Sequence, residues 1–200
     1  MTGLRAAALV VVAMVLAGCA ARPPVVPDEP WQVRSEALAA VDEWEARGRL
    51  SLTSPDDSLQ GSFEWRQRPD WVEIRFRGPV GVGGLFIYGP PERLTAIGRD
   101  GERTELGDPE VDLARVFGFG LPVSSLSYWL LGMADGRYRH DFVFDEFGRP
   151  DRLAQRGWQL HYTGWRELGG ALLPRRVDLA GEGLSIRVVL DRWSPGLDAP

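Results

Sequence analysis

The chain has 200 residues, of which 28 are acidic and 23 are basic, and its net charge is −5. This length fits one domain, or one domain with a tether, and the acidic balance argues against nucleic-acid binding and against a polybasic membrane segment. The single cysteine cannot form a disulfide within the chain, so it needs an explanation of its own.

The N-terminus has the pattern of a targeting segment. Arg5 precedes an apolar run over residues 6–17 that is too short to span a bilayer, and the run ends in Leu16-Ala17-Gly18-Cys19. This ending resembles the bacterial lipobox, in which the cysteine is acylated and becomes the first residue after cleavage. We therefore expect a signal peptide over residues 1–18 and lipidation of Cys19. An ordinary signal peptide that is cleaved near a cysteine is the alternative.

Residues 19–30 are rich in proline and predict a semi-stiff tether. At about 3.1 Å per residue, it would hold the following domain a few tens of Å from the membrane. A disordered leader without a spacing role is the alternative. The globular domain is expected over residues 31–195.

A helix is predicted to follow the tether. Pro30 suits a first helical turn, and the acidic Asp28 and Glu29 suit the positive end of the helix dipole. Gly48 is predicted to end this helix. Large apolar residues recur near helical spacing at Trp31, Leu38, Val41 and Trp44.

Alternation of apolar and polar residues predicts a long series of antiparallel strands. Turn residues such as Pro69-Asp70 and Asp100-Gly101 separate the strands. One face of the resulting sheet would be apolar and the other would be wet. The predicted strands cover residues 50–52, 59–67, 72–77, 85–88, 93–98, 102–105, 138–144, 152–156, 158–162, 172–179 and 184–193.

Two short helices are predicted in the middle of the chain. Asp108 is the expected cap of a helix that begins at Pro109 and ends at Phe117, and Ser124 is the expected cap of a second helix over residues 125–131. Many strands with few helices indicate a mainly β fold of the α+β kind. We expect a strongly curved sheet around an apolar interior, with helices over its open side.

Eight tryptophans are many for this length. For any one of them core packing is the favoured explanation, because aromatic side chains dominate core energetics. For the whole set, an incompletely filled cavity is plausible, since a curved sheet of many strands can enclose more space than its side chains fill.

The segment over residues 78–84 is rich in glycine and uncharged, and it joins two apolar strands. It has no lysine and leads into a strand, which argues against a nucleotide-binding loop. From the pattern alone, a bulged hairpin folded back on the protein is favoured. The alternative is an exposed apolar tip that contacts a membrane or a hydrophobic partner.

Signals of catalysis are weak. The chain has neither a GxSxG nor an HExxH motif, and its only histidines, His140 and His161, fall at isolated positions that alternation places toward solvent. Asp141, Asp145 and Glu146 lie at strand ends, where charged residues are usually solvated. We expect no enzymatic activity, no cofactor and no metal site.

An ordered set of motifs behind the lipobox resembles the LolB family of outer-membrane lipoprotein receptors. The resemblance covers nearly all of the domain, and each piece is weak alone. The motifs are Arg47-Gly48-Arg49-Leu50, Phe63-Glu64-Trp65-Arg66-Gln67, Gly78-Pro79-Val80-Gly81, Leu121-Pro122-Val123, Leu126-Ser127-Tyr128-Trp129-Leu130-Leu131-Gly132, Gly157-Trp158-Gln159-Leu160 with Tyr162, Leu173-Pro174-Arg175-Arg176 and Asp191-Arg192-Trp193.

The resemblance implies an unclosed antiparallel β-barrel of about eleven strands with a helical lid over an apolar cavity. It implies a carrier that accepts the acyl chains of lipoproteins from the periplasmic carrier LolA and places them in the outer membrane. It also implies a lipid anchor at the periplasmic face, and we expect a monomer. Ala20 fits outer-membrane sorting, which disfavours aspartate after the acylated cysteine.

The resemblance also implies two groups of site residues. The family's protruding loop carries an apolar residue after an Asn/Gly-Pro pair. This residue is Val80 here, where leucine is common, and Val82 is expected to compensate for its smaller size. The expected lining of the acyl cavity is Phe63, Trp65, Ile74, Phe76, Ile87, Trp129, Trp158 and Tyr162.

Two other functions stay open at this point. The first is a lipoprotein scaffold that binds another envelope protein through its aromatic face and has a solidly packed interior. The second is an envelope hydrolase, which would need two carboxylates about 5 to 9 Å apart for sugar chemistry. The sequence does not single out such a pair.

Overall fold

The computed structural model describes residues 30–55, 58–79, 84–117 and 120–196. The expected signal peptide (1–18) and Cys19 lie outside the described residues, as do almost all of the tether (19–30) and the two loop residues Val80 and Val82. The predicted domain limits, 31–195, therefore stay a prediction.

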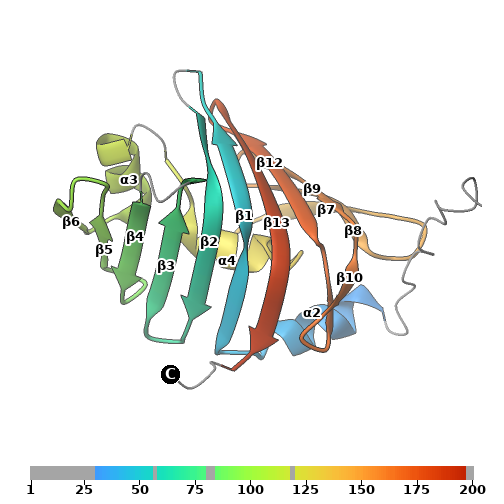
Figure 1. The fold of residues 1–200 in the computed structure, drawn as a ribbon. Coiled ribbons are helices and arrows are strands. Elements are labelled where there is room, and N and C mark those ends of the chain that lie inside the picture. Colours follow the sequence, from blue (N-terminus) through green and yellow to red (C-terminus); the bar gives the residue numbers. More distant parts are fainter. Residues whose placement is uncertain (1–29, 56–57, 80–83, 118–119, 197–200) are drawn as a thin grey trace, which may run out of the picture.

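One antiparallel sheet of eleven strands forms most of the structure (Figure 1). Its strand order is β6-β5-β4-β3-β2-β1-β13-β12-β9-β8-β7, so the first and last strands of the chain pair in the middle of the sheet. The strands are β1 (Trp44–Thr53), β2 (Ser58–Gln67), β3 (Val72–Arg77), β4 (Gly84–Gly89), β5 (Leu94–Ile97), β6 (Arg103–Leu106), β7 (His140–Phe144), β8 (Pro150–Gln155), β9 (Trp158–Thr163), β12 (Arg176–Gly181) and β13 (Leu184–Pro195).

The edge strands β6 and β7 do not pair with each other, so the curved sheet is an unclosed barrel. A separate hairpin of β10 (Arg166–Leu168) and β11 (Ala171–Leu173) completes the strands of the described residues. This architecture confirms the predicted unclosed antiparallel barrel of about eleven strands.

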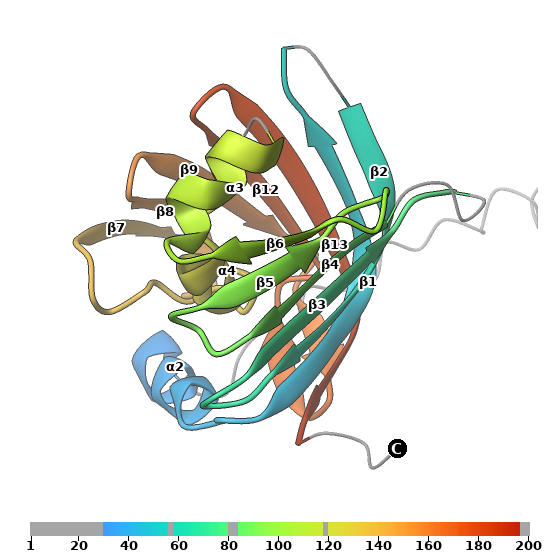
Figure 2. The same ribbon diagram turned by 90° about the vertical axis from the view of Figure 1, so that its left-hand side faces the viewer.

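In the described part of the chain, three helices cover the concave side of the sheet (Figure 2). They are α2 (Trp31–Ala39), α3 (Pro109–Phe117) and α4 (Val123–Trp129), and α4 contributes the buried Val123, Leu126 and Trp129 to the core. None of the described helices is long and apolar enough to cross a membrane. The helices form the expected lid over the concave side.

The alternation of residue types sets the two faces of the sheet. In β13, Leu184, Ile186, Val188 and Leu190 are buried on the concave side, whereas Ser185 and Arg187 between them are exposed. Burial of apolar area contributes about 25 cal/mol per Å² to folding, so this alternation fixes which face of each strand meets the lid. The predicted apolar and wet faces are confirmed.

The first helix is shorter than predicted. It ends at Ala39, and Trp44, Ala46 and Gly48 instead form the buried face of β1. A Cβ atom at Gly48 would overlap the carbonyl oxygen of Val189, and the register of β1 on β13 shifts between Arg47 and Gly48. Gly48 therefore lies at an irregularity of β1, where the backbone of β13 leaves no room for a side chain. The prediction that Gly48 ends a helix was wrong.

Two further predictions need correction. The single strand expected over residues 172–179 is two strands, β11 and β12, because Pro174 between them cannot donate to a ladder. Ser124 does not cap α4, since the helix begins at Val123 and the cap position holds Pro122. The predicted cap of α3 is confirmed, because the backbone N–H of Val111 donates to Asp108 Oδ1 at 3.3 Å.

Candidate functional site: a lidded cavity at one end of the barrel

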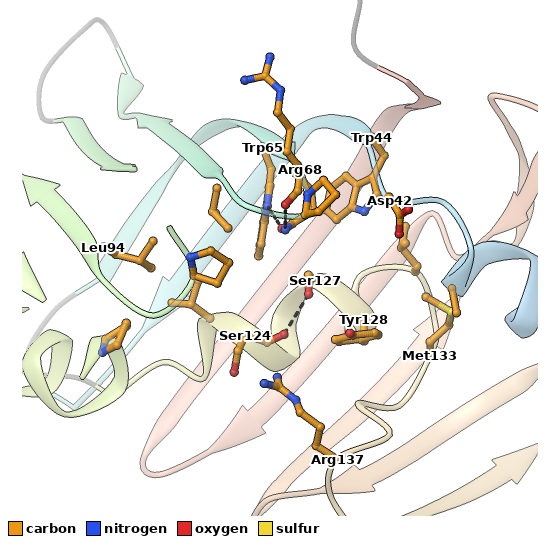
Figure 3. A pocket seen from close by; sticks show the side chains of 18 of the residues that line it. Asp42, Trp44, Trp65, Arg68, Leu94, Ser124, Ser127, Tyr128, Met133 and Arg137 are labelled. Atoms are coloured by element: carbon orange, nitrogen blue, oxygen red, sulfur yellow. Dashed lines mark hydrogen bonds between the residues drawn. The ribbon is translucent and has the colours of Figure 1, made fainter. Parts of the chain in front are cut away.

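A cavity of about 530 Å³ lies between one end of the sheet and the lid. This volume is in the range of about 300–1,000 Å³ that is typical of small-molecule sites. Figure 3 shows Trp44, Trp65 and Leu94 of the sheet around the same space as Ser127 and Tyr128 of α4. The cavity is thus a gap between the barrel and its lid, and a movement of α4 would change its size.

The sheet supplies an aromatic and aliphatic floor. Trp44 and Trp65 pack with ring centroids 5.7 Å apart, and Val72 and Leu94 extend the floor across β3 and β5. The indole N–H of Trp65 donates to Gln67 Oε1 at 3.2 Å, which satisfies its polar edge. The rings therefore offer apolar surface to the cavity without an unpaired donor from Trp65.

The roof comes from α4 and the segment that follows it. Leu131 and Met133 are buried and line the cavity, whereas Ser124 and Ser127 present small hydroxyl side chains to it. Small residues at these two helix positions leave space that larger side chains would fill.

The mouth of the cavity is polar. It is bordered by Arg68 in the turn between β2 and β3, by Glu92 in the turn between β4 and β5, and by Asp42 after α2. These turns lie at the end of the sheet where Val72 pairs with Gly89. An apolar interior behind a charged mouth suits a ligand with an apolar tail and a polar head.

The eight residues predicted to line an acyl cavity all lie in strands or in α4, but they do not form one open cavity. Trp65 alone among them lines the cavity described above. Six of the others are buried in the interior, where the ring centroids of Trp129 and Trp158 are 6.1 Å apart. Ile74 is only half-buried. Contact of these residues with acyl chains stays a prediction. The seven residues away from the cavity are Phe63, Ile74, Phe76, Ile87, Trp129, Trp158 and Tyr162.

Sequence reasoning missed several lining residues. The sequence pattern predicts a helix at Trp44 and strands at Val72 and Leu94, and it does not mark these three residues as part of a cavity. Tyr128 and Leu131 belong to the motif around α4, so the lid motif was the one signal that could have identified them. Whether an inner-face residue meets a cavity or a neighbour depends on how the lid packs.

A buried polar network joins the lid to the sheet. The Asp135 carboxylate accepts hydrogen bonds from Ser125 Oγ at 2.8 Å and from the guanidinium of Arg137 at 2.8 and 2.9 Å. Gln155 Oε1 accepts from the indole N–H of Trp129 at 2.7 Å and from the backbone N–H of Asp135 at 2.9 Å. The network therefore holds α4 and the segment after it against the end of β8.

Arg156 extends this network to α3. Its guanidinium donates to both carboxylate oxygens of Glu110, at 2.5 and 2.7 Å, and to Ser125 Oγ at 3.1 Å. Arg156 has a φ of +54° in the tight turn between β8 and β9, a conformation that an arginine rarely adopts. This strained backbone occurs at the residue whose side chain connects two of the lid helices, α3 and α4, to the sheet.

The network has a defined pH dependence. Burial of the Asp135 carboxyl alone would raise its pKa, but hydrogen bonds from Arg137 and Ser125 outweigh burial and leave the pKa below its ordinary value. A lowered pKa in the folded state stabilises the protein above the unfolded pKa of about 3.9, and this contribution is lost as the pH falls through the folded pKa.

We expect Asp135→Asn to lower the free energy of unfolding at neutral pH by about 1.5–3 kcal/mol, the usual value of hydrogen bonds to a charged group. The difference from the wild type should shrink as the pH falls below about 4, because the wild-type carboxylate is then protonated. Urea unfolding at several pH values measures this. Asp141→Asn, at an exposed strand position, is the control and should change stability by less than about 0.5 kcal/mol. A constant difference at all pH values would contradict the assignment.

The histidines and Tyr162 lie outside this network. His140 and His161 are both exposed, as alternation predicted. Burial raises the pKa of Tyr162 well above its ordinary value, so its hydroxyl stays neutral inside the barrel. Within the described ranges, no three His, Cys, Asp or Glu side chains are grouped so that they could hold a metal ion.

A family model and two related proteins that match most of this chain have the same family name. The family model described as "Outer membrane lipoprotein LolB" matches residues 42–193. An outer-membrane lipoprotein LolB of Alkalilimnicola ehrlichii is 39% identical over 185 residues, which cover 91% of this chain and 92% of that protein. A protein of the same name from Halorhodospira halophila is 36% identical over 187 residues, or 91% of each chain.

A solved structure shares the fold. A LolA-superfamily protein from Nitrosomonas europaea superposes with a TM-score of 0.50 at 12% sequence identity, covering 88% of this chain and 96% of that one. At this level of identity the likeness concerns the fold alone, an open barrel with helices on its concave side.

Proposed function

Because this chain belongs to the LolB family of outer-membrane lipoproteins, we propose that it is a lipoprotein receptor at the outer membrane. It accepts acylated lipoproteins from a LolA-like periplasmic carrier and inserts them into the membrane. The relatives that are named as outer-membrane lipoproteins match 91% of this chain, and this similarity supports the proposed role.

The lidded cavity is the observation that carries this proposal. Acyl chains in water cost about 25 cal/mol per Å² of exposed apolar area, so a carrier must shelter them during transfer. A gap of about 530 Å³ with an aromatic floor and a polar mouth gives the first part of such a shelter. The deeper core residues, among them Trp129 and Trp158, would line its extension once α4 moves away from the sheet.

In this proposal, the transfer neither forms nor breaks a covalent bond. The sequence contains no motif for a nucleotide, so the acyl chains pass down a gradient of affinity from the carrier to this receptor and then to the bilayer. Such a gradient requires that this receptor bind acyl chains more tightly than the carrier does and less tightly than the bilayer does. In this proposal the protein works as a monomer without enzymatic activity, cofactor or metal, and it binds no nucleic acid.

Attachment to the membrane is proposed to come from Cys19. Acyl groups contribute roughly 0.8 kcal/mol per buried CH₂, so several chains on one cysteine give a stable anchor. The proline-rich tether would then place the domain on the periplasmic face of the outer membrane, with enough reach for the domain to meet a soluble carrier.

Delivery is proposed to depend on Val80 and Val82. Their segment connects Arg77 at the end of β3 to Gly84 at the start of β4, whereas the mouth of the cavity borders the opposite end of these strands, where Val72 pairs with Gly89. Neither Gly78 nor Pro79 lines the cavity. In this proposal the loop is a membrane contact that is separate from the surface that receives the lipoprotein.

A photoreactive group on the acyl chain of a client lipoprotein tests the proposal. After transfer from the carrier, illumination should label peptides that line the cavity, namely those with Trp65, Tyr128 and Met133. Peptides from the convex face, such as the one with Arg187, should stay unlabelled. Labelling of the convex face alone would favour a scaffold that binds proteins through its surface.

A further inference from the structure

A row of basic residues crosses the convex face of the sheet, on the side away from the lid. Arg49 of β1 pairs with Ser62 of β2, and Ser62 pairs with Arg77 of β3. Adjacent strands are about 4.8 Å apart, so the two arginines stand about 9.6 Å apart on either side of a small serine. In the next row, Arg187 of β13 pairs with Ser51 of β1.

These residues form a surface groove of about 480 Å³. Arg49, Arg77 and Arg187 line it, and none of its lining residues is acidic. Arg49 donates to Asp191 at 3.0 and 3.2 Å and Arg187 donates to Asp178 at 2.6 Å. The guanidinium of Arg77 has no ion-pair or hydrogen-bond partner among the residues that the structure describes, although its backbone pairs with β2 and β4.

The position of the groove, beside the segment that follows β3, indicates which ligand it could bind. Gly78 and Pro79 line it, so it borders the segment that the proposed function brings to the membrane. The chain as a whole is acidic, with a net charge of −5, and an anionic bilayer would repel it on average. Arg77, whose guanidinium is not paired with a carboxylate of the described residues, would offset this repulsion locally at the membrane-facing end.

We propose that this groove binds the phosphate headgroup of an anionic phospholipid in the outer membrane. The planar guanidinium group matches phosphate oxygens in a bidentate geometry, and Ser51, Ser62 and Gln60 add donors between the arginines. Pro79 and Val189 supply apolar surface for the glycerol end of the lipid. The inference deepens the proposed function, because it rests on that function for the end of the barrel that meets the membrane.

Binding to vesicles tests the inference with the full chain that carries Cys19→Ala and so lacks the acyl anchor. Flotation is compared between phosphatidylcholine vesicles and vesicles that also contain phosphatidylglycerol, and the difference between them isolates the headgroup contribution. We expect phosphatidylglycerol to strengthen binding and Arg77→Gln to weaken that gain about fivefold, the usual effect of one basic residue near an anionic surface. Ser62→Asp, which places a carboxylate between the two arginines, should weaken it at least as much.

Arg75→Gln is the matched control, since Arg75 lies two residues away on the same face of β3 but outside the groove. If Arg75→Gln and Arg77→Gln reduced the gain from phosphatidylglycerol equally, the groove would not be a specific site, and general charge attraction would explain the binding. No gain from phosphatidylglycerol would also overturn the site. If inorganic phosphate bound the groove while vesicle binding ignored Arg77, the lipid would be the wrong source of phosphate. Client lipoprotein is absent throughout, so this test can fail while lipoprotein transfer from the carrier stays normal.

Discussion

Ser127→Trp is expected to block reception of acylated lipoproteins while the protein stays folded. Ser127 is half-buried on α4 and lines the cavity, so an indole at this position would occupy space that is now empty and would cause little overpacking of the core. We expect the amount of labelled lipoprotein accepted from the carrier to fall at least tenfold, which corresponds to about 1.4 kcal/mol of binding free energy. Transfer is measured by co-purification of the label, and folding by circular dichroism.

Ser35→Trp is a closely matched control for this prediction. Ser35 is also half-buried on a helix, and its hydroxyl donates to the carbonyl of Gln32 at 2.9 Å, as Ser127 Oγ donates to that of Ser124 at 2.9 Å. Ser35 does not line the cavity, so its variant should accept lipoprotein normally. Normal acceptance by Ser127→Trp would show that the cavity is not the acyl site.

Val80→Glu is expected to produce the opposite defect, with normal reception and impaired delivery. A carboxylate at position 80 would have to lose its water for this segment to enter the membrane as proposed, which costs several kcal/mol. The variant should therefore accept lipoprotein as the wild type does and release it into vesicles at least tenfold more slowly. Delivery is measured as the rate at which labelled lipoprotein moves from the receptor to floating vesicles.

Val33→Glu serves as the control, because Val33 is 48% exposed on α2 and already tolerates water. Its delivery rate should match that of the wild type. Normal delivery by Val80→Glu would remove the loop from the mechanism. Impaired reception by the same variant would mean that the loop also contributes to the cavity or to contact with the carrier.

The sheet could be predicted from sequence because the alternation of strand residues has a period of two, which is clear in strands such as β9 and most of β13. Val72, Ile74 and Phe76 alternate with charged residues, and β3 has the bounds that this alternation indicates. The prediction failed where two periods fit the same residues. Trp44 lies at a helical spacing from Trp31 and at a strand spacing from Ala46, and only pairing with β13 and β2 decides in favour of the strand.

The cavity was harder to predict than the sheet. Inner-face residues such as Trp65 and Phe63 follow the same alternation, yet one lines the cavity and the other packs in the core. The difference arises from the position of α4, which Asp135, Gln155 and Arg156 hold through contacts across long stretches of the chain. Alternation along one strand contains no information on such contacts.

The most direct test of the account is transfer of a labelled, acylated lipoprotein from its periplasmic carrier to this protein. The carrier is loaded with the lipoprotein, and the full chain with Cys19→Ala is added. We predict that the label leaves the carrier and co-purifies with this chain. The account would be contradicted if the label stayed on the carrier although the added chain was folded and bound to that carrier, because the cavity would then not be a site for acyl chains.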